Sequence, residues 1–476
     1  MHRSKQPKVR VQIPDNGFEG CAALSEYWNA ELETMAWSGV ERWQAGRLAE
    51  SLPALWQRSR FYARLHGDRV GQVSMRSLSD LGELPFTLKD DLRAAQQAAS
   101  ADAPFGENQA APLADIVQAI SSSGTTGPPL YYALTARDVD VFSDAIANVW
   151  FTAGIRRDDV VAHLVGLPMV AGGLPYADGF RRVGATLCWL GGFPTERILL
   201  DLRRLRVSAL LATTSFALYL AERWDEVGRA SGLPSSLRKV LGGGEPGLGS
   251  PELRARIERG LQLTHLRETM GLGDVLPSMW GECEAQDGMH FNAQRYVALE
   301  LIDPDTGAQR PWADGATGEL VYTAFVRDAT PLVRYRSRDH AQVIGVRCAC
   351  GRTSPRIRCI GRTDDMLIYK GMNVFPTAIR DCVLQRFAGR VEPVLRLLKD
   401  SPTQVRFDET IPLEIEAAAP LDAAQGAALA REIEAAVRGQ LQVRVAVRVL
   451  PAHTLPRGTY KNALVALRDG AAKGSP

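Results

Sequence analysis

Residues 207–230 have the sequence VSALLATTSFALYLAERWDEVGRA, and this stretch decides the fold class. Its first part, 207–215, is an apolar run of strand length, whereas 216–230 carry apolar residues at helical spacing. The alternation continues on both sides, with further strand-length runs and helical patterns at 160–167, 185–191, 195–206, 239–244 and 250–261. Strands that alternate with helices are typical of a parallel sheet covered on both faces, so the sequence predicts an α/β protein.

The two ends of the chain differ from this middle part. Residues up to about Tyr62 carry apolar side chains close to helical spacing. After about Trp280, short apolar runs around turn residues, such as 297–307 and 318–326, favour antiparallel strands. From about Met366, short strands mix with a helical pattern in a block large enough to fold as a domain. We therefore expect a large domain over 1–363 and a small α+β domain over 364–476.

The composition excludes several classes of protein. The chain has 476 residues, of which 45% are hydrophobic and 23% charged, and its formal net charge is +2. This balance does not indicate nucleic-acid binding, and no run approaches the roughly 18 apolar residues of a membrane span. The first residues are polar and charged, which predicts no signal peptide. Seven cysteines, an odd number in a long chain, favour a reducing compartment, so we expect a cytoplasmic globular protein.

A loop rich in hydroxyl groups and glycine, SSSGTTGPP, spans residues 121–129. It lies between two apolar runs, and a loop between two strands can present backbone N–H groups and hydroxyls to phosphate oxygens. The lysine and the spacing of a Walker loop are absent, and a flexible linker is the alternative. The candidate phosphate-binding residues are Ser122, Ser123, Gly124, Thr125, Thr126 and Gly127.

A second glycine cluster, GGGEPG at 242–247, formally matches the dinucleotide-binding pattern G-x-G-x-x-G after a strand. Glu268 follows at the distance expected for the acid that binds a ribose in such folds. Pro246 opposes this interpretation, because proline removes an N–H donor from the turn. A Rossmann-type nucleotide-binding protein is therefore kept as an alternative.

Three thiols and one imidazole form a candidate metal site. The set is Cys283, His290, Cys348 and Cys350, and Cys₃His is a ligand set of closed structural zinc sites. The alternative is four unrelated side chains, with the thiols packed as small apolar groups. We predict a structural zinc ion.

Six motifs follow one another along the chain. They are SSSGTTG, GGGEPG, MGLGD (270–274), YRSRD (335–339), GRTDDMLIYKGMNVFP (361–376) and PRGTYKNAL (456–464). In this order they resemble the adenylate-forming superfamily of acyl-CoA ligases, most closely its phenylacetate–CoA ligase branch. The resemblance covers residues 121–464, and its most specific piece is the block 361–376. The order of the motifs disfavours the Rossmann alternative.

The resemblance implies a fold and a reaction. The implied fold is a large N-terminal domain with mixed sheets flanked by helices and a β subdomain, followed by a small mobile α+β domain. The implied enzyme is an AMP-forming aryl- or arylacetate–CoA ligase. It would join an aromatic acid to AMP and then to CoA, with release of pyrophosphate and AMP. ATP, CoA and Mg²⁺ are the implied cofactors, and some members of the branch bind zinc through a similar Cys/His set.

The resemblance also assigns roles to single residues. The loop at 121–127 would close over the β- and γ-phosphates of ATP. Asp339 would accept hydrogen bonds from the ribose hydroxyls, with Arg362 assisting, and Asp274 would help to hold Mg²⁺. Lys461 would neutralise charge at the α-phosphorus. The remaining assigned positions are a loop at the adenine and the acid (Gly243, Gly244, Glu245 and Pro246), a hinge (Asp364) and a glycine beside the pantetheine chain (Gly371).

The chain departs from the pattern of the superfamily at two motifs. Pro128 stands where the phosphate loop usually has lysine, and MGLGD replaces Tyr-Gly-Leu-Ser-Glu. The second change removes a hydroxyl at Gly273 and one methylene at Asp274. These changes predict weaker ATP binding or compensation by other groups. A degenerate enzyme is disfavoured, because Asp339, Arg362 and Lys461 stand in place.

The acid and its acceptor are less sharply indicated. Apolar residues near the expected pocket, including Phe216, Met279 and Trp280, suit a planar ring. The alternative class is an adenylating enzyme that passes the aromatic acid to an amine or a carrier protein. The oligomeric state stays open, with a homodimer as one alternative.

Overall fold

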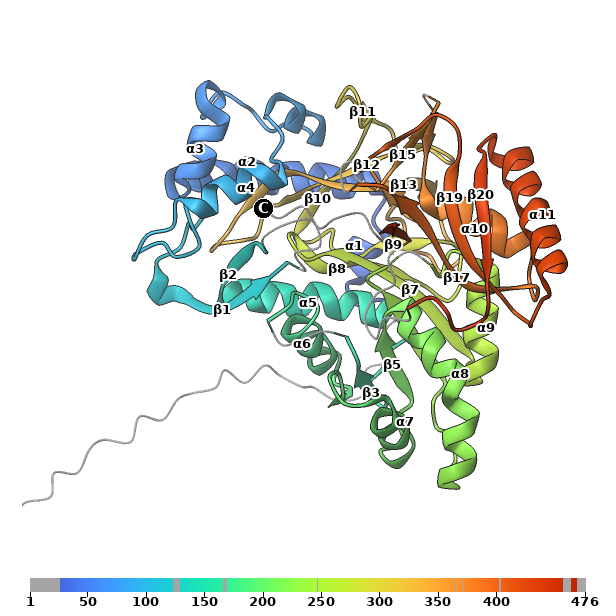
Figure 1. Ribbon diagram of the computed structural model, residues 1–476. Coiled ribbons are helices and arrows are strands. Elements are labelled where there is room, and N and C mark those ends of the chain that lie inside the picture. The colour runs from blue at the N-terminus through green and yellow to red at the C-terminus, as the bar shows by residue number, and fades with distance from the viewer. Residues whose placement is uncertain are drawn as a thin grey trace, which may run out of the picture.

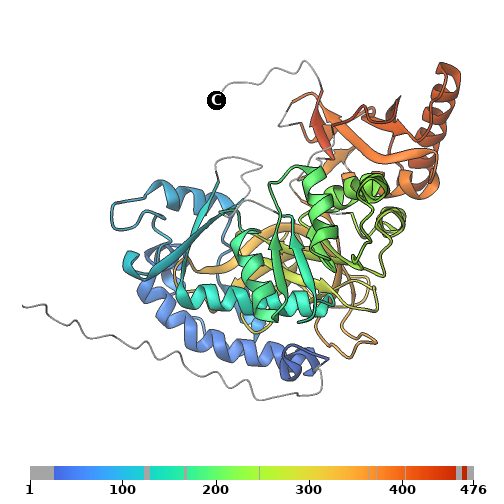
Figure 2. The same ribbon diagram turned by 90° about the horizontal axis from the view of Figure 1, so that it is seen from below.

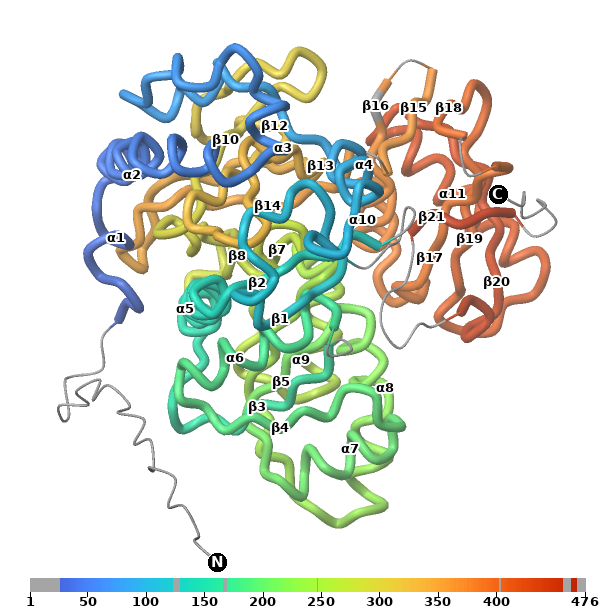
Figure 3. The backbone as a smooth tube through the Cα atoms, turned by 90° about the vertical axis from the view of Figure 1, so that its left-hand side faces the viewer, coloured from blue at the N-terminus to red at the C-terminus, as the bar shows by residue number. Residues whose placement is uncertain are grey.

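The computed structural model describes residues 26–122, 129–165, 169–245, 247–363, 365–370, 372–401, 404–456 and 464–468. Figure 1 shows a large body built on one extended sheet, with the last strands and helices gathered on one side. The N-terminal helix α2 and the C-terminal helix α11 lie at opposite ends of the molecule in all three views (Figures 1, 2 and 3).

The N-terminal region is helical, as predicted. Its helices are α1 (Ala30–Thr34), α2 (Trp37–Arg58), α3 (Arg60–His66) and α4 (Lys89–Gln97). The side chains of Val40, Leu48 and Leu52 recur on one face of α2 and are buried in the core. Gln44 connects this helix to the segment before β10, because its Nε2 donates a hydrogen bond to the Gln294 carbonyl oxygen at 2.6 Å.

The predicted parallel sheet is confirmed by five strands in the spatial order β4-β3-β5-β6-β7, all paired in parallel. The strands are β3 (Val160–His163), β4 (Thr186–Trp189), β5 (Ala209–Ala212), β6 (Lys239–Gly243) and β7 (His265–Leu272). Helix α5 (Ala136–Thr152) precedes β3. The helices between successive strands are α6 (Leu174–Val183), α7 (Thr195–Arg204), α8 (Thr214–Ser231) and α9 (Pro251–Leu261).

Alternate residues of these strands enter two different cores. Val161 and Leu211 are buried with residues of α5 and α6, whereas their neighbours Ala162 and Leu210 are buried with residues of α7, α8 and α9. Because side chains of a strand alternate between its faces, helices cover both faces of the sheet.

Antiparallel strands extend the same sheet to twelve strands, as predicted for the region after Trp280. They are β8 (Leu276–Glu282), β9 (Met289–Phe291), β10 (Val297–Ile302), β11 (Gln309–Arg310), β12 (Thr317–Ala324), β13 (Leu332–Gly345) and β14 (Arg356–Arg362). A separate antiparallel pair, β1 (Ile116–Ser121) and β2 (Tyr131–Thr135), flanks the hydroxyl-rich loop, which confirms strands on both sides of it.

The described residues from 365 onwards form two further sheets and two helices, an α+β composition. Strands β15 (Leu367–Tyr369), β16 (Met372–Val374) and β18 (Arg406–Phe407) form one sheet. The other has the order β20-β19-β17-β21 and comprises β17 (Val391–Lys399), β19 (Ile411–Ala417), β20 (Val445–Leu450) and β21 (Val465–Leu467). The helices are α10 (Pro376–Arg386) and α11 (Ala423–Leu441). Among the described residues, we find no helix that combines the length and the apolar character needed to cross a bilayer.

Candidate active site and metal centre

The glycine-rich loop after β6 approaches β7 closely. Gly243 ends β6, and a Cβ atom at this position would lie 2.5 Å from the carbonyl oxygen of Thr269. Gly244 has a φ of +82°, which favours glycine. Glu245 accepts a hydrogen bond from the backbone N–H of Ser215 at 2.5 Å. Because Ser215 lies in the first turn of α8, where the helix dipole favours an anion, this carboxylate fastens the loop to α8.

Asp339 and Arg362 lie directly opposite each other. They are cross-strand partners in β13 and β14, and Arg362 Nη1 donates to Asp339 Oδ1 at 3.0 Å. The aspartate side chain is 10% exposed and the arginine side chain 33% exposed, so both can be reached from solvent. The structure therefore brings together the two residues that the sequence assigns to the ribose.

Asp274 lies in the turn between β7 and β8 and is almost completely buried. Its Oδ1 accepts a hydrogen bond from the Tyr132 hydroxyl at 2.5 Å, and its Oδ2 accepts one from Lys89 Nζ at 3.3 Å. Arg327 holds the backbone of the same turn, since its Nη1 donates to the Asp274 carbonyl oxygen at 2.7 Å. Burial, together with the nearby Asp274 carboxylate, raises the pKa values of Tyr132 and Tyr335 well above the usual value, so both hydroxyls remain protonated donors.

Sequence reasoning missed Lys89 and Tyr132 as neighbours of Asp274. Lys89 is the first residue of α4, where the sequence carries only the signal of a helix start in Lys89-Asp90-Asp91. Tyr132 lies in the apolar run after the hydroxyl-rich loop. They are 185 and 142 residues from Asp274 in the chain, so no local pattern indicates the contact.

The base of the hydroxyl-rich loop is closed by hydrogen bonds. Ser122 donates its backbone N–H to the Leu130 carbonyl oxygen at 2.9 Å, and its Oγ accepts the Leu130 N–H at 3.0 Å. Ser122 and Leu130 thus hold the two ends of the loop together. The other predicted phosphate-binding residues, Ser123, Gly124, Thr125, Thr126 and Gly127, lie outside the described residues, as do Pro246, Asp364, Gly371 and Lys461.

The apolar residues expected near the acid pocket are buried in the core. Met279 and Trp280 are fully buried, and the Trp280 indole N–H donates to the Tyr322 hydroxyl at 2.9 Å. Phe216 is 5% exposed and its ring stacks against Tyr219. These side chains therefore pack in the protein core.

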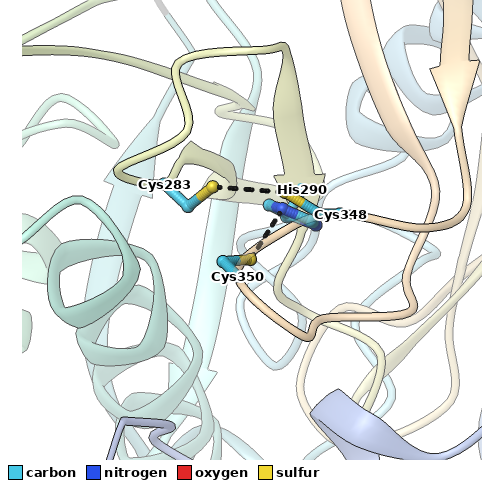
Figure 4. Close-up of side chains that lie close together, drawn as sticks. All are labelled: Cys283, His290, Cys348 and Cys350. Atoms are coloured by element: carbon cyan, nitrogen blue, oxygen red, sulfur yellow. Dashed lines mark hydrogen bonds between the residues drawn. The ribbon is translucent and has the colours of Figure 1, made fainter.

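The four predicted metal ligands lie together (Figure 4). Their ligand atoms are all within 4.8 Å of one another. Cys283 Sγ lies 3.7 Å from Cys348 Sγ, and Cys350 Sγ lies 3.4 Å from His290 Nε2. Ligands of a tetrahedral zinc ion, with Zn–S about 2.3 Å and Zn–N about 2.0 Å, are about 3.5–3.8 Å apart. The donor set and its spacing therefore fit zinc.

The cluster connects two turns at the end of the sheet. Cys283 follows β8 and His290 lies in β9, whereas Cys348 and Cys350 lie in the turn between β13 and β14. The Tyr27 hydroxyl donates a hydrogen bond to the Cys350 carbonyl oxygen at 3.1 Å, so the N-terminal region also contacts this cluster. A metal here would link the β8–β9 region to the turn between β13 and β14, and its role would be structural.

Comparison with known proteins identifies the family. Residues 65–324 match the AMP-binding enzymes. The chain is 33% identical over 361 residues to the phenylacetate–coenzyme A ligase of Thermus thermophilus, covering 75% of this chain and 78% of that protein. It is 30% identical over 427 residues to the phenylacetate–coenzyme A ligase of Aromatoleum evansii, covering 89% and 91%.

The chain belongs to the AMP-binding enzymes. The predicted resemblance to the phenylacetate–CoA ligase branch of the adenylate-forming superfamily is confirmed. The Rossmann-type alternative is not favoured, since the glycine cluster at 242–247 lies within the AMP-binding match. Transfer to an amine or a carrier protein is not favoured either, because the two relatives at 30% identity or more that are named above are CoA ligases.

The fold of this AMP-binding enzyme is also similar to that of 2-hydroxyisobutyryl-CoA ligase. In the postadenylation state of that ligase with 2-HIB-AMP, the TM-score is 0.84 at 26% identity, covering 96% of this chain and 95% of that chain. In its thioesterification state with 2-HIB-AMP and CoA, the TM-score is 0.67, covering 97% and 96%. The structure of this chain is therefore more similar to the postadenylation state of that ligase than to its thioesterification state.

Proposed function

We propose that this AMP-binding enzyme is an acid–thiol ligase that activates an aryl or arylacetic acid with ATP and transfers the acyl group to CoA. The observation that carries the proposal is the Asp339–Arg362 pair in a chain that matches the AMP-binding enzymes. Tyr335 connects this pair to the Asp274 turn, since its hydroxyl interacts electrostatically with Asp274, Arg362 and Asp339. Groups suited to a ribose thus lie beside the turn between β7 and β8, which carries Asp274.

The reaction has two steps. A carboxylate oxygen of the acid attacks the α-phosphorus of ATP, and pyrophosphate leaves. The thiol sulfur of CoA then attacks the carbonyl carbon of the acyl-adenylate, and AMP leaves. The carboxylate of Asp339 can accept hydrogen bonds from two vicinal hydroxyls and so hold the ribose during both steps. We propose ATP, CoA and Mg²⁺ as cofactors, and a cytoplasmic location in keeping with the free thiols of the described cysteines.

Support for an aromatic acid comes from the relatives, which are phenylacetate–coenzyme A ligases. One assay tests the proposal: release of AMP and pyrophosphate with a panel of aromatic acids, with and without CoA. We expect a thioester with at least one aryl or arylacetic acid, formed only when CoA is present. AMP release triggered by another nucleophile would support transfer to an amine or a carrier protein. No turnover of ATP with any acid would contradict the proposal.

We propose that Cys283, His290, Cys348 and Cys350 bind a structural zinc ion, because their spacing fits a tetrahedral site. The Cys348→Ser variant is expected to lose bound zinc and to melt about 5 °C lower, which corresponds to about 5 kcal/mol for a chain of 476 residues at about 2.1 cal/mol/K per residue. Elemental analysis and thermal melting are the measurements. The KM for ATP should change less than twofold. Cys188→Ser, a half-buried thiol outside the cluster, is the matched control. Metal-free protein that is folded and active would contradict the prediction.

We propose that Asp364 is the hinge between a large domain (1–363) and a small domain (364–476). The described strands on either side support it, since β14 belongs to the twelve-stranded sheet and β15 to another sheet. Asp364→Pro fixes the φ angle at position 364 and restricts the backbone conformation of Thr363. We expect this variant to slow one half-reaction by more than about tenfold and to leave the rate of the other unchanged. The rates of adenylate and thioester formation are measured separately. Asp364→Ala, which keeps φ free, is the control. Equal loss of both half-reactions in folded protein would contradict the hinge.

A further inference from the structure

A cavity of about 870 Å³ lies between helix α2 and the strands β10 and β11. Helix α2 runs beside β10 (Figures 1 and 3), and Gln44 Nε2 of the helix donates to the Val297 carbonyl oxygen of the strand at 3.0 Å. The turn between β13 and β14 forms another wall through Val346, Arg347 and Thr353. None of the residues that line this cavity is among those assigned above to the nucleotide, the acid or the metal. Its volume lies within the range of about 300–1,000 Å³ that is usual for small-molecule sites.

Three arginines from distant parts of the chain meet at this cavity. They are Arg42 in α2, Arg76 in the segment that follows α3, and Arg347 after β13. All three are exposed, and none forms a salt bridge with any residue that the structure describes. A single exposed arginine is solvated and needs no partner, but three that converge on one cavity create a local positive potential. An anion bound there would interact favourably with all three.

The carboxylates at the cavity do not balance these arginines. Glu300 lines the cavity but already pairs with Arg334, whose Nη2 lies 2.9 Å from Glu300 Oε1. Arg310, a fourth arginine in the wall, is paired with Asp303. Glu41 is the other carboxylate among the lining residues, and it forms no salt bridge with the described part of the chain. Three unpaired arginines therefore face one unpaired carboxylate.

The inner wall of the cavity is apolar. Leu78, Leu299 and Leu301 line it and are buried, as is the indole of Trp37. Trp312 is half-buried at the end of the same wall. An aromatic ring can pack against these side chains, because tryptophan offers a large flat surface and arginine stacks on aromatic faces. The cavity thus combines an apolar wall with unpaired positive charge at its exposed side.

We propose that this cavity is a binding site for an aromatic anion. The ring of the ligand would contact the tryptophans and leucines, and its carboxylate or phosphate would bind Arg42, Arg76 and Arg347. Arginine suits this role, since its planar guanidinium donates two parallel hydrogen bonds to a carboxylate or a phosphate. An aryl carboxylic acid and the CoA thioester of such an acid both have this chemistry. The site is separate from the adenylating site, so the proposal does not depend on the function proposed above.

The test measures the binding of 8-anilinonaphthalene-1-sulfonate, an aromatic anion, to the full chain by titration calorimetry. Probe that binds elsewhere on the chain is common to all variants, so the difference between two isotherms isolates the cavity. The Arg42→Gln/Arg347→Gln variant is expected to bind the probe in the cavity at least about tenfold more weakly, the scale of one charged hydrogen bond. Thermal melting checks that the variant is folded, and Arg76→Gln is the second variant, with an expected loss of at least about threefold.

Arg47→Gln is the matched control. Arg47 also lies on α2 and is exposed, but it pairs with Glu50 and does not line the cavity. The affinity of this variant for the probe should stay within twofold of the wild-type value. Identical isotherms for the wild-type protein and the double variant would overturn the proposal. An equal loss in Arg47→Gln would also overturn it, because the effect would then follow the net charge of the chain and not the cavity.

Competition distinguishes the sources of the ligand. Phenylacetate, phenylacetyl-CoA and inorganic phosphate are each added to wild-type protein that holds the probe. Displacement by phenylacetate at the lower concentration would assign the site to an aryl carboxylate, and displacement by phenylacetyl-CoA at the lower concentration would assign it to the thioester. Displacement by neither, or equally well by inorganic phosphate, would overturn the proposal.

Discussion

Replacement of Lys461 with alanine is expected to lower the rate of adenylate formation by about 10²–10³-fold, the scale of one preorganised electrostatic contact. In this step an anionic carboxylate approaches an anionic triphosphate, and negative charge accumulates on the α-phosphoryl oxygens. An ammonium group at that position lowers the free energy of the transition state most, because the closed site excludes water and weakens the screening of charge. Lys461 follows Gly458 and Thr459 in a segment that can turn.

The second half-reaction provides an internal control for Lys461. Supplied with preformed acyl-adenylate and CoA, the Lys461→Ala protein should form thioester at nearly the wild-type rate, since the lysine would have left the site when the small domain rotates. Lys473→Ala removes a nearby lysine outside the PRGTYKNAL motif and should change neither rate. Equal loss of both half-reactions in folded Lys461→Ala protein would show that the lysine acts differently, and no loss in either would refute its catalytic role.

Asp339→Ala is expected to raise the KM for ATP by about 10²-fold. Its carboxylate would accept two hydrogen bonds from the ribose, and hydrogen bonds to a charged group contribute about 1.5–3 kcal/mol each. The change also leaves the Arg362 guanidinium without the oxygen that it now contacts at 3.0 Å. Steady-state kinetics with varied ATP and the binding of AMP by calorimetry measure the effect.

Asp140→Ala is the matched control for Asp339. It removes an aspartate that is also paired with an arginine, Arg182, but its side chain is 68% exposed on α5. We expect the KM for ATP of this variant to stay within twofold of the wild-type value, because exposed ion pairs contribute little. If Asp339→Ala also kept its KM within twofold, Asp339 would not bind the ribose.

The sheet could be predicted because its signals are local. A strand such as β5 is a short apolar run, and α8 directly after it repeats apolar residues every three or four positions. Both signals lie within a stretch of 24 residues, 207–230, and tertiary packing reinforces them instead of overriding them. The Cys/His cluster was also predictable, because three thiols and an imidazole are a rare combination of metal-binding side chains whatever fold connects them.

Three apolar residues show what an apolar character alone can indicate. Phe216, Met279 and Trp280 were expected near the acid pocket from their apolar character, yet all three are buried in the core. An apolar side chain suits a pocket wall and a core equally well, so composition does not separate the two. Only the packing of neighbouring elements decides between them.

The amino-acid sequence by itself therefore determined the family, the alternation of strands and helices, and the types of residue available to a nucleotide and a metal. The tertiary structure decided which of these residues meet. It placed Arg362 on Asp339 by pairing two antiparallel strands, and it bound Glu245 to the start of α8. It also surrounded Asp274 with Tyr132 and Lys89 from distant segments. The physical reason is that secondary structure follows from side-chain periodicity over one or two turns, whereas a site is made by contacts between segments that only the folded chain brings within hydrogen-bonding distance.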